Sequence, residues 1–320
     1  MKRAEILQLL GYSVPYIKKK RVIVHADIAA EADDQFAIAH HLLTPTEDVV
    51  GIIAANFEWR FRAIPQLRDQ RLQSMEKSYV EGRKMLQLMD IDDVPLLRGA
   101  PDQIADPAAL PVSEGSAFII AEAMRDCDEP LFIALQGTLT DLAVAYLTEP
   151  KIAERIEAAI WIGGGSYPDG GQESNLQQDI YAAQVLFASP MKIWQIPLNT
   201  YAGSFLTFAE LMRKIRPCGE IGRYLCDTMF AVNEWYGQVP RRLSFPHGEV
   251  WSIGDQPTVS VLLQSPSGSR CHIEKAPKIN DDMTYSPDPD GKDILVFDDI
   301  DNRMTMEDLF AKLALCYQED

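Results

Sequence analysis

The chain has 320 residues, of which 47% are hydrophobic, 24% charged and 9% aromatic, a composition typical of a globular protein and not of a disordered or fibrous one. Its 47 acidic residues exceed its 30 basic residues, and the formal net charge is -17. This charge repels phosphate backbones and anionic membrane surfaces, so we expect no polymeric nucleic acid and no membrane as partner. Small neutral substrates and cations bound by carboxylates are compatible with it.

Cysteine usage and the amino-terminal segment indicate a compartment. The cysteines are odd in number, widely spaced and never in a C-x-x-C pair: Cys127, Cys218, Cys226, Cys271 and Cys316. This pattern predicts reduced thiols. No export signal is recognisable near the start, and no apolar run approaches the ~20 residues that cross a bilayer. We therefore expect a cytoplasmic protein.

Strands and helices are predicted to alternate along the chain. Buried strands are predicted for the apolar segments 21–27, 49–56, 131–137, 156–165 and 191–199. Helices are predicted for segments 36–43, 63–89, 140–147 and 180–189. Such alternation is typical of a mostly parallel central sheet with helices on both faces. No linker, repeat or low-complexity tract divides the chain, so we predict one α/β domain over residues 1–320, with its site at the carboxyl ends of the strands.

The carboxyl-terminal part begins with a second acidic segment, S-P-D-P-D-G-K-D, followed by I-L-V-F. This segment lacks the ligand spacing of an EF-hand, and D-P-D-G is a strong turn signal. We therefore predict a hairpin over residues 286–297 and a packing helix over residues 306–317. The glycine run 163–165 lacks the context of a nucleotide-phosphate loop, and we expect it to let a ligand or backbone approach closely.

The loop after the first predicted strand concentrates four carboxylates within eight residues: Asp27, Glu31, Asp33 and Asp34. Two interpretations are open. Acidic residues at a helix start can cap free N–H groups, which would explain Asp33 or Asp34. A hard cation such as Ca²⁺ would relieve the repulsion of all four, and it also explains Asp27. We favour the cation.

Five ordered segments resemble the inosine-uridine-preferring nucleoside hydrolases. Their first strand ends in D-x-D-P-G-x-D-D, and here Asp27 falls on its second Asp, with Asp33 and Asp34 on its final pair after a loop two residues longer. The other similar segments are V-V-G-I-I-A-A-N, L-Q-G-T-L-T-D-L-A, G-G-G-S-Y-P-D-G-G-Q-E-S-N and I-G-D-Q-P-T-V-S-V-L-L. The resemblance runs through most of the chain. It implies a nucleoside hydrolase-like fold and the Ca²⁺-dependent hydrolysis of the N-glycosidic bond of a ribonucleoside or related ribosyl compound.

The resemblance also implies a role for each site residue. The metal ligands would be Asp27, Asp34, the backbone carbonyl of Gln136, and Asp255. Asp27 would also be the catalytic base that takes a proton from the attacking water. The residues that hold sugar hydroxyls would be Asp33, Asn56, Glu173 and Asn175. Without the resemblance, Asn56 is interpreted as a loop-stabilising amide, Glu173 and Asn175 as turn residues, and Asp255 as a helix cap.

Two departures from the family pattern affect this prediction. His25 replaces the first Asp of the motif, and Gly254 stands where many members have the histidine that protonates the leaving base. The group that protonates the leaving base is therefore not identified by the resemblance, and Tyr236 and His247 are the candidates. His25 is interpreted as a pocket residue or, slightly in preference, as a hydrogen-bonded core histidine.

Further residues have open roles. His40 and His41 are predicted to lie at a helix surface and at the core edge. The aromatic residues that could stack on a base or pack in the core are Trp235, Tyr236, Phe245 and Trp251. The rival functions are a non-catalytic Ca²⁺-dependent sugar or nucleoside binder and a hydrolase of another glycoside. Relatives form dimers or tetramers, so we expect a homo-oligomer.

Overall fold

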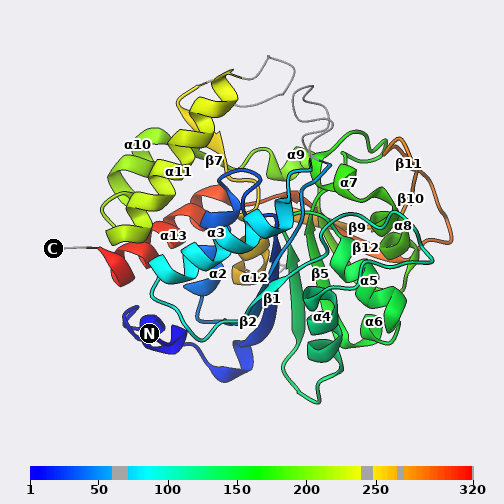
Figure 1. Ribbon diagram of the computed structural model, residues 1–320, viewed down its shortest axis with the longest axis horizontal. Coiled ribbons are helices and arrows are strands. Elements are labelled where there is room, and N and C mark those ends of the chain that lie inside the picture. Colours follow the sequence, from blue (N-terminus) through cyan, green and yellow to red (C-terminus); the bar gives the residue numbers. More distant parts are fainter. Residues whose placement is uncertain (60–70, 239–247, 265–269, 319–320) are drawn as a thin grey trace.

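The computed structural model describes residues 1–59, 71–238, 248–264 and 270–318. Its centre is an eight-stranded sheet with the strand order β3-β2-β1-β4-β5-β6-β12-β9 (Figure 1). The strands are β1 (Lys20–Ala26), β2 (Glu47–Ala54), β3 (Leu96–Arg98), β4 (Leu131–Leu135), β5 (Ile156–Ile162), β6 (Ile193–Ile196), β9 (Arg270–Lys275) and β12 (Asp293–Asp299). Neighbouring strands in this sheet are parallel, except that β9 runs antiparallel to β12. The predicted mostly parallel sheet is confirmed.

Helices cover both faces of the sheet (Figure 1). One face carries α2 (Asp34–Leu42), α3 (Ser74–Leu88), α11 (Gly219–Gln238), α12 (Pro257–Gln264) and α13 (Asn302–Tyr317). The other face carries α4 (Glu114–Met124), α5 (Thr140–Thr148), α6 (Ile152–Arg155) and α8 (Ile180–Ala188). The shorter helices are α1 (Arg3–Gln8), η1 (Tyr16–Lys18), α7 (Ser174–Gln178), α9 (Leu198–Tyr201), α10 (Phe208–Glu210) and the π-helical η3 (Leu211–Ile215). Two small two-stranded sheets pair β7 (Phe205–Thr207) with β8 (Val250–Ser252) and β10 (Lys278–Ile279) with β11 (Tyr285–Ser286).

The central strand β1 is buried on both faces, as the apolar run at its centre, residues 22–24, predicts. Val22, Val24 and Ala26 pack into the hydrophobic cluster under α2 and α12, whereas Ile23 packs into the cluster under α4 and α5. This alternation follows from the two-residue period of a strand. The carboxyl end of β1 is therefore held rigidly between two packed layers, and Asp27 is the first residue beyond it.

Several sequence predictions need correction. The predicted hairpin over residues 286–297 does not form, because β11 pairs with β10 while β12 pairs with β6 and with β9. Long-range pairing outcompetes the local turn there. Helices α4 and α11 and strand β9 were not predicted. Residues 63–70 of the predicted helix 63–89 lie outside the described residues, and the helix described within the rest of that range is α3.

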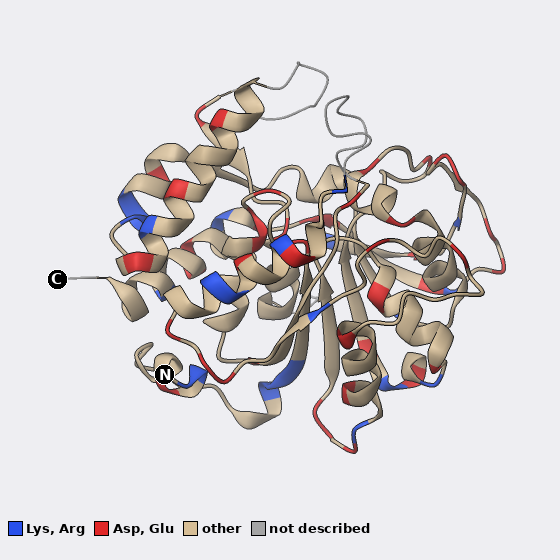
Figure 2. Ribbon diagram, in the orientation of Figure 1, with Lys and Arg blue, Asp and Glu red and all other residues tan. Residues whose placement is uncertain are grey.

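Acidic residues are distributed over both helical layers (Figure 2). Among the described residues, no helix is long and apolar enough to cross a membrane.

Candidate metal and sugar site

The predicted site residues gather at the carboxyl edge of the sheet. Asp27 follows β1, Asn56 follows β2 and Gln136 follows β4, and each of the three is at least 99% buried. The three strands are neighbours in the order β2-β1-β4, so parallel pairing alone brings these side chains to one edge. The glycine run after β5 continues the same edge.

Three carboxylates form the acidic centre of this edge. One oxygen each from Asp33, Asp34 and Asp255 lie within 4.8 Å of one another, and all three residues are buried. Burial raises the pKa of Asp255 well above its usual range, and the charges of Asp33, Asp34, Asp27 and Glu31 raise it further. Buried carboxylates at this separation repel unless a proton or a cation neutralises them. Hard carboxylate oxygens are the ligands that Ca²⁺ and Mg²⁺ prefer, so this donor set fits such an ion.

The capping interpretation of this loop is not supported for Asp33. Asp33 occupies the cap position of α2, but its side chain makes no capping hydrogen bond there. Its carboxylate instead joins Asp34 and Asp255. The resemblance predicted that Asp33 binds the sugar and that Asp27 binds the metal. In the structure the three close carboxylates include Asp33 and do not include Asp27.

Asp27 lies against the backbone after β4. A Cβ at position 137 would be 2.9 Å from Asp27 Oδ1, so Gly137 leaves the room that this carboxylate occupies. Asp27 is also close enough to Asp255 for its charge to act on the pKa of that carboxyl. The structure therefore places Asp27 beside the trio and against Gly137, the residue that follows Gln136.

The side-chain amides of Asn56 and Asn175 are held in the same way, with the nitrogen bonded to a backbone carbonyl. The Asn56 amide donates from Nδ2 to the carbonyl of Ala100 at 3.1 Å, and the Asn175 amide donates to the carbonyl of Ile162 at 2.9 Å. Both Oδ1 atoms are buried, and no donor among the described residues reaches them. A buried acceptor without a donor is costly, so these oxygens suit a ligand that supplies hydroxyl or N–H groups.

Glu173 has a structural task. Its side chain caps α7, accepting hydrogen bonds from the backbone N–H groups of Asn175 and Leu176. It also accepts from the N–H of Gly164 at 2.8 Å and from the hydroxyl of Tyr201 at 2.7 Å. Tyr201, at the end of α9, was not singled out from the sequence.

The residues that replace family side chains are both accounted for. His25 is fully buried, and its Nε2 pairs with Asp141 Oδ2 at 2.9 Å, which supports the core interpretation. At position 254, a Cβ would lie 3.0 Å from the ring of Tyr201 and 3.5 Å from Asp33 Oδ2. The ring of Tyr201 thus takes the room into which a side chain at Gly254 would extend.

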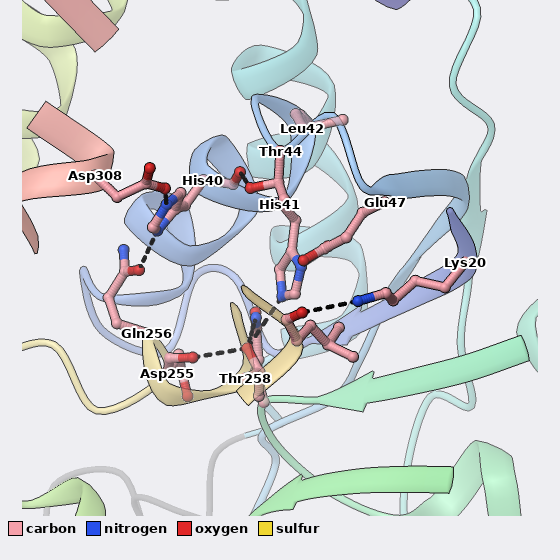
Figure 3. A network of polar contacts seen from close by, with 12 residues as sticks. Lys20, His40, His41, Leu42, Thr44, Glu47, Asp255, Gln256, Thr258 and Asp308 are labelled. Carbon is pink, nitrogen blue, oxygen red and sulfur yellow. Dashed lines mark hydrogen bonds and ion pairs between the residues drawn. The ribbon is translucent and has the colours of Figure 1, made fainter. Parts of the chain in front are cut away.

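A buried polar network holds the start of α12 and the turn before it, which carries Asp255 (Figure 3). The Thr258 hydroxyl donates its one proton to the carbonyl of Asp255 at 2.8 Å. Gln136 Nε2 at 2.9 Å and His41 Nε2 at 3.0 Å must therefore donate to Thr258. His41 is held from its other side by Glu47. Thr258 consequently links two of the proposed metal ligands, Gln136 and Asp255.

The prediction that His40 and His41 lie at a helix surface and core edge is wrong, because both are fully buried. His40 contacts Gln256 through Nδ1 and Asp308 through Nε2 (Figure 3). These partners lie more than 200 positions away along the chain. The local signal was only a pair of polar residues within an apolar helix pattern.

An apolar cavity of about 430 Å³ opens beside the acidic loop. Its lining residues are Ala29, Ala30, Glu31, Phe57, Leu72, Lys77, Thr228, Ala231, Val232, Trp235 and Tyr236. Tyr236 donates to Glu31 Oε1 at 3.1 Å, and its ring contacts those of Trp235 and Trp251. Predicted aromatic residues therefore line this cavity or pack beside it. Phe245 and His247 lie outside the described residues.

Comparison with known proteins identifies the family. The model of the inosine-uridine preferring nucleoside hydrolase family matches residues 67–306, well over half of the chain, and the match begins after the acidic loop. The probable uridine nucleosidase 2 of Oryza sativa subsp. japonica is 21% identical over 129 residues, which are 39% of this chain and 38% of that protein. The match therefore spans well under half of that relative.

Two further relatives extend over more of the chain. The pyrimidine-specific ribonucleoside hydrolase RihB of Escherichia coli (strain SE11) is 24% identical over 240 residues, 67% of this chain and 70% of that one. A solved plant nucleoside hydrolase, the PpNRh1 enzyme, superposes with a TM-score of 0.69 at 17% identity and covers 92% of this chain and 98% of its own. The structural likeness shows a shared fold, and the family match carries the assignment. The chain belongs to the inosine-uridine preferring nucleoside hydrolase family.

Proposed function

We propose that the protein hydrolyses the N-glycosidic bond of a ribonucleoside or related ribosyl compound, with Ca²⁺ as cofactor. The observation that carries this proposal is that Asp27 lies close to the buried trio Asp33, Asp34 and Asp255 at the carboxyl edge of the sheet. The chain belongs to a family of nucleoside hydrolases, which supports the same reaction. The amide oxygens of Asn56 and Asn175, which no donor in the described part of the chain reaches, add acceptors that suit sugar hydroxyls.

The proposed metal ligands are Asp27, Asp34, the carbonyl of Gln136, and Asp255, and the close contact of Asp33 with Asp34 and Asp255 makes it a further ligand candidate. A bound Ca²⁺ would supply positive charge that lowers the pKa of a water and neutralises the trio. In the proposed reaction the water oxygen bonds to C1′, and the bond from C1′ to the base nitrogen breaks with its electron pair going to the base. Asp27 accepts the proton of the water.

The carboxylates have a second proposed task. The sugar gains positive charge as the bond to the base breaks, and nearby negative charge stabilises that state. The leaving base would occupy the apolar cavity beside Glu31 and Tyr236, which is large enough for a nucleobase. The Tyr236 hydroxyl, bonded to Glu31, is a candidate for the group that protonates the base.

A hydrolysis assay with matched variants tests the proposal. Purified protein is incubated with purine and pyrimidine nucleosides and CaCl₂, and released reducing sugar and free base are measured. We expect Asp27→Asn to lower kcat by about 10²- to 10⁴-fold, the usual effect of losing a general base. Asp34→Asn should mainly weaken Ca²⁺ binding in calorimetry. Asp293→Asn, which changes an exposed carboxylate on β12, is the control and should leave both unchanged.

A non-catalytic Ca²⁺-dependent binder is the second candidate. It is favoured by position 254, where a glycine packed against Tyr201 provides no proton donor. Calcium-dependent nucleoside binding without release of base would select it, and turnover that survives both Asp27→Asn and a chelator would refute the hydrolytic mechanism. Cytoplasmic localisation and homo-oligomer formation stay predictions.

A further inference from the structure

Lys77 places a positive charge at the apolar cavity beside the acidic loop. Among the described residues that line this cavity, it is the only cationic one. It lies near the start of α3, and it is exposed, so it lies at the mouth of the cavity. Glu31 lines the same cavity and accepts a hydrogen bond from Tyr236. A base bound there would therefore meet one ammonium group in a mostly apolar lining.

Hydrogen bonds at the start of α3 hold Lys77 beside the cavity wall. The hydroxyl of Ser74 accepts from the N–H of Phe57 at 2.9 Å, and the N–H of Ser74 donates to Glu58 Oε1 at 2.8 Å. Glu58 Oε2 accepts from the N–H of Leu72 at 2.9 Å. Phe57 and Leu72 themselves line the cavity. Because residues three apart share one face of a helix, Lys77 follows Ser74 on the side of α3 that is tied to this wall.

The ammonium group of Lys77 has no structural task in the described part of the chain, where no carboxylate forms an ion pair with it. Glu81, four residues further along α3, is the carboxylate that helical spacing would offer as a partner. Glu81 instead accepts hydrogen bonds from the amide of Gln35 and from the hydroxyl of Tyr224. The charge of Lys77 is therefore available to a ligand in the cavity.

The proposed reaction creates a negative charge on the base. When the bond from C1′ to the base nitrogen breaks, its electron pair goes to the base, which stays negative until it is protonated. Gly254 supplies no proton donor for that step. A fixed cation close to the developing charge lowers the barrier without any proton transfer.

We propose that Lys77 is a further catalytic residue, which contacts the leaving base and stabilises the negative charge that the base gains. A Lys77 N–H donates to an acceptor on the edge of the base that is remote from the ribosyl group, because the sugar is bound at the buried carboxylates and Lys77 lies at the mouth. No covalent bond to the lysine forms. The inference rests on the proposed function in taking the apolar cavity as the site of the base.

Two substrates that differ in the charge of the leaving base test this role. The first is the nucleoside that the wild type cleaves fastest, whose base becomes negative as it leaves. The second is N-ribosylnicotinamide, whose base starts as a pyridinium cation and leaves as a neutral molecule. We expect Lys77→Met to lower kcat/KM for the first by about 10- to 100-fold, the usual effect of losing a hydrogen bond to a charged group. The variant should cleave the second at least as well as the wild type does, because a lysine beside a pyridinium repels it.

Binding of free bases gives a second measurement that needs no turnover. At pH 8, 5-nitrouracil is largely an anion, whereas uracil is largely neutral. In calorimetry with CaCl₂, Lys77→Met should weaken the binding of 5-nitrouracil by about 10-fold and that of uracil by less than about 3-fold.

Two further variants separate charge from structure. Lys77→Arg keeps the positive charge and should retain more of the nucleoside kcat/KM and of the 5-nitrouracil affinity than Lys77→Met does. Lys84→Met is the matched control on the same helix, since the ammonium group of Lys84 lies 3.9 Å from the centre of the Tyr224 ring and is not part of the cavity lining. It should change neither measurement.

Three results would overturn the inference: an unchanged kcat/KM for the nucleoside in Lys77→Met, an equal loss for both substrates, or, if the wild type does not cleave N-ribosylnicotinamide, an equal change in affinity for the two free bases. A wild type that releases no base from any substrate would instead sink the proposed hydrolysis. Selective loss of 5-nitrouracil affinity would then leave the contact of Lys77 with the base standing, and unchanged affinity would remove that as well.

Discussion

Replacing Asp255 by asparagine changes the acidic trio with little change in shape. The substitution keeps the size of the side chain but removes one of three negative charges whose oxygens lie within 4.8 Å of one another. Without a divalent ion, the wild-type trio must hold protons or tolerate repulsion. Asp255→Asn should therefore make the metal-free protein more stable, although it removes a proposed ligand.

The structure sets the size of the effect. Two unit charges 4.8 Å apart repel by about 3 kcal/mol at an effective dielectric constant of about 20. Asp255 faces two such neighbours, and protonation already relieves part of the repulsion, so we expect the free energy of unfolding to rise by about 2 to 4 kcal/mol at pH 8.

The pH dependence follows from the raised pKa of Asp255. Between the ordinary carboxyl pKa and the raised one, the folded protein holds more protons than the unfolded chain, so stability falls as pH rises through this window. Asp255→Asn should flatten that part of the profile. Calcium displaces the proton, so the Ca²⁺ affinity of the wild type should rise with pH.

Urea unfolding from pH 4 to 9, with EGTA or with excess CaCl₂, measures these effects. Calcium at 100 times its Kd should stabilise the wild type by about 2.7 kcal/mol and Asp255→Asn far less, so calcium should remove most of the stability advantage of the variant. Asp293→Asn, exposed on β12, should stay within about 0.5 kcal/mol of the wild type throughout. A metal-free Asp255→Asn protein less stable than the wild type, or one with a full calcium response, would refute the reasoning.

Two further predictions concern the supports of the site. Thr258→Val should lower the free energy of unfolding by roughly 2 to 4 kcal/mol and weaken Ca²⁺ binding, because it leaves Gln136 Nε2 and His41 Nε2 without their acceptor, while the Asp255 carbonyl keeps the backbone N–H of residue 258. Denaturant unfolding and calorimetry check this, and a loss under 1 kcal/mol would contradict it. Gly137→Ala should lower kcat at least about 10-fold and lower the free energy of unfolding by about 1 to 3 kcal/mol, because the added Cβ would lie 2.9 Å from Asp27 Oδ1 and displace that carboxylate. A kcat equal to that of the wild type would show that the position of Asp27 does not matter.

The sequence alone was enough to predict the parallel sheet and the edge on which the site lies. The strands β1, β2, β4, β5 and β6 are nearly continuous apolar runs, and residues that follow them directly are brought together by parallel pairing. Strand ends therefore put Asp27, Asn56 and Gln136 on one edge, whereas the site roles of Asn56 and Gln136 were predicted only by the resemblance to the family. The hairpin over residues 286–297 failed because the preferred partner of β12 was not its neighbour in sequence.

Tertiary structure decided which carboxylates meet. Four acidic side chains follow β1 closely, and periodicity cannot say which of them turn toward Asp255, more than 200 residues away. The same holds for the contact of His41 with Thr258 and of Tyr201 with Glu173. Strand and helix periods are local properties of the chain, whereas these contacts depend on how packed layers bring distant loops to one edge of the sheet.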